Sequence, residues 1–241
     1  MSEPNEPGGV KMVVLPGLDG MAALRAAFCA ELSPEFDVCA IEYPVDLVCY
    51  DDLFDWISAR LPEQDYIIVA ESFSGPLAIQ IAAQRPSQLK GLVFVASFAK
   101  APRKLPAAVQ GLLRLVPFRL KVFSVMAQLV MMGRWRNAAF TQLFHDTNQK
   151  LPASTVRGRI GEVLSVDCTA KLALIDVPYI YLGASHDRPV PRRAANDFRH
   201  GAQSVGIVEG PHFMLQAVPK PVAEHVEAFV RSLSQRRSRA L

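Results

Sequence analysis

The sequence contains none of the features that would point to a membrane or to secretion. Its longest apolar stretch, residues 122–133, is shorter than the roughly 18 residues that a membrane-spanning helix needs. Residues 1–9 are acidic and contain proline, the opposite of a signal peptide. The four cysteines form no CxxC pair and no cluster with metal-ligand spacing, which indicates free thiols in a reducing compartment. We therefore expect a cytoplasmic protein that needs no metal or other cofactor.

Acidic residues are missing from the middle of the chain. Residues 72–145 contain ten Lys and Arg and no Asp or Glu, whereas residues 1–71 contain fourteen acidic and three basic residues. A basic block of this kind is either a solvated face or a surface for an anionic partner. Because no nucleic-acid-binding motif accompanies it, nucleic acid is not expected as a partner.

Short apolar runs alternate with segments of helical periodicity. Half of the 241 residues are hydrophobic, which is enough for a sizeable core. The runs predict strands over residues 11–15, 36–41, 66–70, 91–96, 179–182 and 204–208, and helices over 21–32, 50–61, 76–84, 193–198 and 218–233. Alternating strands and helices build a parallel sheet that helices cover on both faces. The predicted fold class is therefore α/β.

The alternation stops at residues 98–170, which are helical, apolar and basic without a clear strand. We predict a core of residues 10–97 and 171–235, with residues 98–170 inserted as a helical cap or lid. Ligands of open parallel sheets bind beyond the carboxyl ends of the strands. An insertion that leaves the carboxyl end of the fourth strand would therefore hang over the binding site.

A serine follows directly on the third predicted strand. Ser72 is flanked two positions away by the small residues Ala70 and Ser74, as a strained strand-to-helix turn requires for an exposed nucleophile. In the alternative register Ser74 is the nucleophile, and the bulky Pro76 then stands two positions after it. A further alternative is that both serines only cap the helix. The pattern favours Ser72.

A serine nucleophile needs a base, and the base needs an acid that orients it. His212 lies between the last strand and the last helix, and Asp187 follows the fifth strand. No acid follows the fourth strand, so Asp187 is the candidate acid. The chain order Ser72, Asp187, His212 is the one expected for this turn. The alternatives are a turn or cap aspartate and a surface histidine.

The glycine-rich residues 16–20 follow the first strand. Such a turn lets backbone N–H groups face the site, so we predict that the N–H groups of Leu18 and Phe73 bind the oxyanion. An ordinary strand-to-helix turn is the alternative. Asp19 is interpreted as a helix N-cap rather than as a catalytic residue.

In this order, the motifs resemble those of a serine hydrolase of the α/β-hydrolase fold, such as an esterase or lysophospholipase. The resemblance covers residues 10–235 and is carried by residues 15–20, 70–75, 183–191 and 210–213. It implies a mostly parallel sheet of about six strands, in the order 4-3-5-6-7-8 of the family's numbering. It also implies a Ser-His-Asp catalytic triad that cleaves carboxylic esters through an acyl-enzyme intermediate.

The chain departs from this family at three points. Pro16 stands where a histidine is common, Ala70 and Ser74 replace the usual glycines, and there is no room for two antiparallel strands before residue 10.

The inserted segment bears on the substrate. Residues 102–136 combine many apolar residues, including Met126, Met131 and Met132, with seven basic residues, a composition suited to lining an acyl pocket. We expect a small-molecule ester as substrate. The basic side chains are a solvated face or contact an anionic lipid or an acyl carrier. An acyl thioesterase and a non-catalytic binding protein therefore stay open as alternatives, and so does the oligomeric state.

Overall fold

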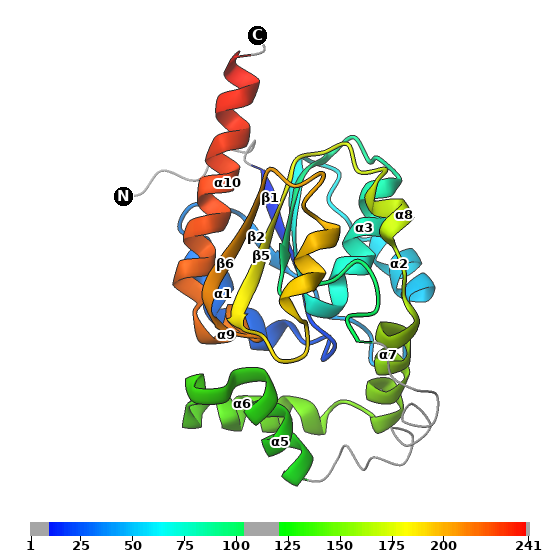
Figure 1. Cartoon of the computed structure of the whole chain (residues 1–241), viewed down its shortest axis with the longest axis vertical. Helices are drawn as coiled ribbons and strands as arrows, with labels where there is room; N and C mark the ends of the chain where they lie inside the picture. Colours follow the sequence, from blue (N-terminus) through cyan, green and yellow to red (C-terminus); the bar gives the residue numbers. More distant parts are fainter. Residues whose placement is uncertain (1–9, 104–120, 240–241) are drawn as a thin grey trace.

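The computed structural model describes residues 10–103 and 121–239. Their strands form one parallel sheet in the order β2-β1-β3-β4-β5-β6. The strands are β1 (Lys11–Leu15), β2 (Val38–Ala40), β3 (Tyr66–Glu71), β4 (Leu89–Val95), β5 (Tyr179–His186) and β6 (Ser204–Pro211). This is the α/β class that the strand–helix alternation predicts and the strand order that the family resemblance implies (Figure 1).

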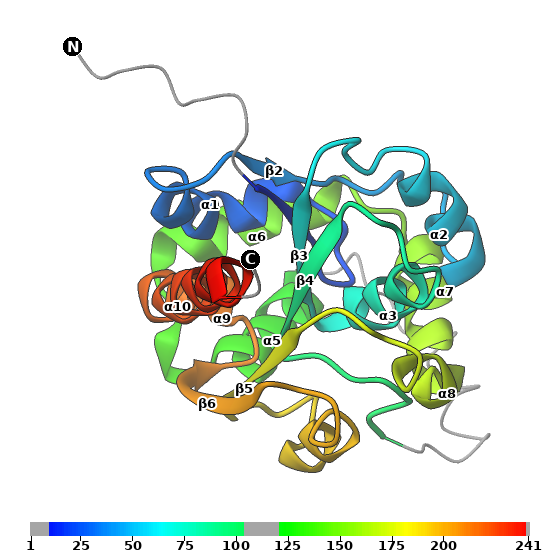
Figure 2. The ribbon, with the colours of Figure 1, turned by 90° about the horizontal axis from the view of Figure 1, so that it is seen from above.

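Helices cover both faces of the sheet (Figure 2). One face carries α1 (Ala26–Leu32), α9 (Met214–Ala217) and α10 (Pro219–Arg239), and the other carries α2 (Tyr50–Ser58), α3 (Gly75–Ala83) and α8 (Thr169–Leu172). Successive side chains of a strand point to opposite faces. In β3, Ile67 and Val69 therefore join the core under α1 and α10, and Ile68 and Ala70 join the core under α3. Burial on both faces explains why the inner strands β1, β3, β4 and β5 are largely apolar, whereas the edge strand β6 also has exposed residues.

Some predicted elements differ in detail. The predicted helix over residues 21–32 begins as a 3₁₀ turn, η1 (Ala22–Arg25), before α1. The predicted helix over residues 193–198 is the 3₁₀ helix η4 (Arg192–Asp197). Strands β5 and β6 run further than predicted because their pairing continues to His186 and Pro211 across an irregularity in register.

The described part of the inserted segment contains α5 (Lys121–Met132), the 3₁₀ turn η3 (Gly133–Trp135), α6 (Ala138–Gln149) and α7 (Ala153–Ser165). In Figure 1 these helices lie below the sheet, beyond the carboxyl ends of its strands. Part of the predicted basic and apolar set lies outside the described residues: Lys104, Leu112, Leu113, Arg114, Leu115, Val116, Phe118 and Arg119. Among the helices that are described, none is long and apolar enough to cross a membrane.

Candidate active site

The turn at Ser72 is sharp and leads directly from a strand into a helix. Strand β3 ends at Glu71, and the 3₁₀ turn η2 (Ser72–Ser74) leads directly into α3. Ser72 has a φ of 47°, a left-handed conformation that is unusual for a residue with a side chain and marks local strain. Gly75 makes the turn possible, because a Cβ there would collide with Ser97 Oγ. The Ser97 hydroxyl in turn donates to the Ser72 carbonyl at 2.6 Å.

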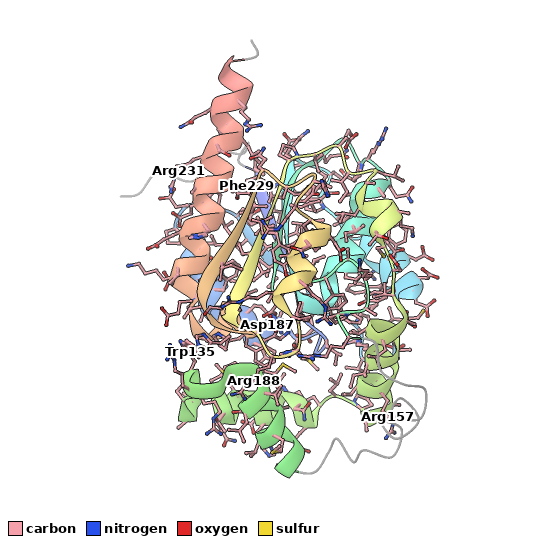
Figure 3. The ribbon with its side chains drawn as sticks, viewed as in Figure 1. Trp135, Arg157, Asp187, Arg188, Phe229 and Arg231 are labelled. Carbon is pink, nitrogen blue, oxygen red and sulfur yellow. The ribbon has the colours of Figure 1, made fainter. Side chains whose placement is uncertain are left out.

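The structure brings the three predicted side chains together. Ser72 Oγ lies 2.9 Å from His212 Nε2, and His212 Nδ1 lies 2.8 Å from Asp187 Oδ2. The Val190 N–H donates to the other Asp187 oxygen at 2.7 Å, which fixes the carboxylate. Asp187 lies at the carboxyl end of β5, on the side that faces α5 and α6 (Figure 3). With Nδ1–H donated to Asp187, Nε2 is free to accept the serine proton.

The environment of His212 favours its charged form. Burial on its own lowers the pKa of His212, but the charge and hydrogen bond of Asp187 outweigh it, and the pKa is raised above its ordinary value of 6.5. Glu71 adds to the increase in this pKa, and Arg25 opposes it. An imidazolium formed here is therefore stabilised by neighbouring carboxylates.

Ser74 has different partners. Its side chain is buried, and its hydroxyl bonds to the Pro16 carbonyl and to the Tyr43 hydroxyl. Ser74 therefore joins the turn at residues 72–74 to the loop after β1, whereas His212 Nε2 is bonded to Ser72.

A cavity of about 340 Å³ lies at the carboxyl ends of the strands, next to Ser72 and His212. The predicted oxyanion residues Leu18 and Phe73 both line it. The rest of its wall is almost entirely apolar and comes from core loops and from α5, α6 and α7: Gly17, Asp19, Phe98, Pro102, Ala127, Met131, Phe144, Asn148, Leu151, Val156, Ile160, Val163, Pro189, Val190 and Phe213.

A larger hollow of about 500 Å³ lies at the opposite end of the sheet. Arg85, Lys90, Asp176 and Ser87 are among its lining residues, and none of the predicted site residues is.

The prediction that Asp19 is an N-cap is wrong. The N-cap position of η1 is Met21, and Asp19 lies two residues before it. Asp19 Oδ1 accepts from the Met21 N–H at 2.8 Å, and both carboxylate oxygens also accept from the Arg25 guanidinium. The Asp19 carboxylate therefore pairs with Arg25, a contact that the sequence pattern does not predict.

Two buried arginines beside the site were not singled out from the sequence. Arg25 and Arg159 are 1% and 0% exposed. Arg25 stands in an apolar helical segment and Glu71 ends an apolar strand, so each is an isolated charge among apolar neighbours. A charge that is buried among apolar residues needs a buried partner. The apolar surroundings of Arg25 and of Glu71 are therefore the sequence signal that could have predicted their ion pair. Arg159 left no comparable signal, since its acceptors are backbone carbonyls.

Within residues 10–103 and 121–239, no three His, Cys, Asp or Glu side chains are grouped so that they could hold a metal ion.

The comparisons with known proteins agree on the fold. The sequence model of a family described as "Alpha/beta hydrolase family" matches residues 12–225, and the chain belongs to that family. No curated protein matches the chain.

Solved structures of the same fold include enzymes with several named activities. The enol-lactonase from Burkholderia xenovorans LB400 superposes with a TM-score of 0.82 at 11% identity, over 95% of this chain and 94% of that chain. A putative lipase from Acinetobacter baumannii AYE superposes with a TM-score of 0.80 at 16% identity, over 95% of this chain and 87% of that chain. An esterase from Exiguobacterium antarcticum superposes with a TM-score of 0.79 at 14% identity, over 93% of this chain and 92% of that chain. At these identities the likeness establishes the fold alone.

Proposed function

We propose that this protein is a carboxylic ester hydrolase with Ser72 as nucleophile, His212 as base and Asp187 as the orienting acid. The observation that carries the proposal is the unbroken hydrogen-bonded chain from Asp187 through His212 to Ser72, which ends at the wall of an apolar cavity. The family membership and the similar fold of a lactonase, a lipase and an esterase support the same class of reaction.

In the first half-reaction, Ser72 Oγ attacks the ester carbonyl while His212 Nε2 takes its proton. The carbonyl oxygen becomes an oxyanion, and the backbone N–H groups of Leu18 and Phe73 are the proposed donors to it. When the tetrahedral intermediate collapses, the imidazolium returns its proton to the departing alcohol, and the acyl group stays on Ser72. In the second half-reaction, His212 activates a water molecule that releases the acid and restores the serine.

The cavity wall indicates which part of the substrate it holds. Phe98, Phe144 and Phe213 line it together with aliphatic side chains. Burial of apolar surface favours an apolar acyl chain there. We propose that helices α5, α6 and α7 act as a cap that shields this chain from water, since each contributes side chains to the wall.

A fluorophosphonate probe tests the nucleophile, because it labels an activated serine and no ordinary one. We expect labelling of the intact protein, with the modified peptide mapping to Ser72 and not to Ser74, and loss of labelling and of p-nitrophenyl ester hydrolysis in Ser72→Ala. Ser87 is an exposed serine in the opposite hollow. The matched control Ser87→Ala should keep both the labelling of Ser72 and the hydrolysis of the p-nitrophenyl ester. Absence of labelling would identify a non-catalytic binding protein.

An acyl thioesterase is the second candidate, and the basic rim of the cavity favours it. Arg103 and Arg188 adjoin the wall residues Pro102 and Pro189, and the Arg103 side chain donates to the Arg188 and Pro189 carbonyls. Exposed cations beside an acyl pocket suit the phosphates of coenzyme A or an acidic acyl carrier. Comparison of kcat/KM for acyl-CoA and p-nitrophenyl esters of equal chain length, at low and high salt, separates the two. A thioesterase would prefer acyl-CoA and lose that preference as salt rises.

A further inference from the structure

The loop that carries Leu18 is held by charges from two directions. On one side, the buried Arg25 guanidinium forms ion pairs with Asp19 and with Glu71. Its Nη2 donates to Asp19 Oδ2 at 2.8 Å, and its Nε donates to Glu71 Oε2 at 2.7 Å. Asp19 follows Leu18 in the chain, and Glu71 precedes Ser72. One rigid guanidinium therefore joins the loop of the first proposed oxyanion donor to the turn of the second, Phe73.

On the other side, Arg159 reaches the same loop from α7 in the inserted segment. Its Nη1 donates to the Leu18 carbonyl at 2.9 Å, and its Nη2 donates to the Pro44 and Leu47 carbonyls at 2.8 and 3.0 Å. Its guanidinium carbon also lies 5.9 Å from the centre of the Phe73 ring. Arg159 therefore contacts both residues whose N–H groups are the proposed oxyanion donors.

Two glycines of the loop make room for these guanidinium groups. A Cβ at Gly17 would stand 2.8 Å from Arg25 Nη2, and a Cβ at Gly20 would stand 2.5 Å from Arg159 Nη1. Neither guanidinium can move aside without breaking its hydrogen bonds. Gly20 also has a φ of 73°, which favours glycine on conformational grounds. The glycines and the arginines therefore fit each other as one arrangement.

Stability alone is a weak reason for this arrangement. Burying an ion pair costs much desolvation energy, and replacing the whole pair by well-packed apolar side chains is often equally stabilising, although removing only one partner is not. In return, a fork of fixed hydrogen bonds specifies the position of a backbone segment more tightly than apolar contact does. Oxyanion donors need such accuracy, since they act only when they are already aimed at the developing charge.

We propose that Arg25 and Arg159 are positioning residues that together set the Leu18 N–H relative to the Phe73 N–H. The inference rests on the proposed function, because it concerns the oxyanion of that reaction. Neither arginine needs to touch the substrate; each acts through the loop of residues 16–20.

The test replaces each arginine by lysine, which keeps the charge and loses the planar fork. For Arg25→Lys and Arg159→Lys we expect kcat to fall by about 10- to 100-fold, less than the roughly 100- to 1,000-fold expected for deletion of an oxyanion donor. KM for a p-nitrophenyl ester should change by less than about threefold, because only the transition state uses the donors. Affinity for a trifluoromethyl ketone with the same acyl chain should fall in parallel with kcat/KM, since its adduct with Ser72 carries the oxyanion.

Val226→Ala is the control for a merely structural effect. Val226 is a fully buried residue of α10, in the core between α10 and the sheet, and it does not line the cavity. Its truncation lowers the midpoint of urea unfolding and should leave kcat and inhibitor affinity unchanged. If Arg25→Lys does not fold, Asp19→Asn weakens the same link more gently and should still lower kcat and inhibitor affinity together.

The outcomes separate this inference from the proposed function. An active wild-type enzyme whose folded arginine variants keep kcat and inhibitor affinity within about twofold overturns the positioning role and leaves the function standing. A wild-type protein that neither turns over esters nor reacts with the fluorophosphonate overturns both.

Discussion

The two ends of the sheet differ in what their charged groups do. At the amino ends of the strands, the larger hollow is lined by Arg85 and Asp176, whose ion pair is 60% and 52% exposed. At the carboxyl ends, Asp187 and His212 are 3% and 4% exposed around a smaller cavity. Charges kept out of water have strong effects on one another, whereas exposed pairs contribute little. Buried polar groups, and not the size of a hollow, therefore distinguish the end of the sheet that we propose as the active site.

The largest expected difference is in kcat, between substitutions of two aspartates that lie at opposite ends of the sheet. Asp187→Asn deprives His212 of its orienting acid, so kcat should fall by about 10⁴-fold while the fold is kept. Asp176→Asn removes an exposed ion pair at the opposite end and should leave kcat unchanged. Steady-state kinetics on a p-nitrophenyl ester checks both. Equal losses in the two variants would contradict the assignment of the site.

The second comparison is between the contributions of Arg159 and Arg85 to the free energy of unfolding. Arg159→Met leaves the carbonyls of Leu18, Pro44 and Leu47 without their buried donor, and we expect the free energy of unfolding to fall by about 2–4 kcal/mol. Arg85→Met, in the exposed pair, should change it by less than about 0.5 kcal/mol. Urea unfolding followed by circular dichroism measures both, and similar values would show that Arg159 is not anchored as described.

The cavity wall should control chain-length preference. Phe144→Ala enlarges the apolar cavity, so the acyl chain with the highest kcat/KM should become longer, with a gain of up to about tenfold for the longer esters. Leu233→Ala enlarges the opposite hollow and should leave the profile unchanged. A chain-length series of p-nitrophenyl esters decides this, and an unaltered profile in Phe144→Ala would place the acyl chain elsewhere.

The smallest expected effect concerns pH. His212 accepts a proton only when neutral, so kcat/KM should fall as pH decreases through its pKa, with a midpoint above the ordinary 6.5 because Asp187 and Glu71 raise that pKa. Glu71→Gln removes one of these raising charges and should move the midpoint to lower pH. Asp176→Asn again serves as the control. A midpoint that moves upward in Glu71→Gln would contradict the electrostatic account.

Local pattern predicted the sheet because the inner strands β1, β3, β4 and β5 are buried on both faces and therefore read as apolar runs. The candidate site was predictable for a related reason. Ser72, Asp187 and His212 each follow a strand, and parallel topology gathers residues at strand ends into one place.

The links among Arg25, Asp19 and Glu71 were not predictable in the same way. They join segments 6 and 46 residues apart, and no periodicity connects them. Arg159 lies 141 residues from the carbonyl of Leu18, and a basic residue in a basic region gives no sign that it is buried. The predicted helix over residues 21–32 begins as a 3₁₀ turn that ends at Arg25, and the Arg25 side chain donates to the Met21 carbonyl of that turn.

The origin of Arg159 has a practical consequence for engineering. Helix α7 lines the cavity and also supplies the donor to the Leu18 carbonyl. With the positioning role proposed for Arg159, replacing α5, α6 and α7 to change specificity would also remove a residue that sets the proposed oxyanion loop. A successful chimera keeps Arg159 and its contacts to Leu18, Pro44 and Leu47, and takes its new specificity from α5 and α6.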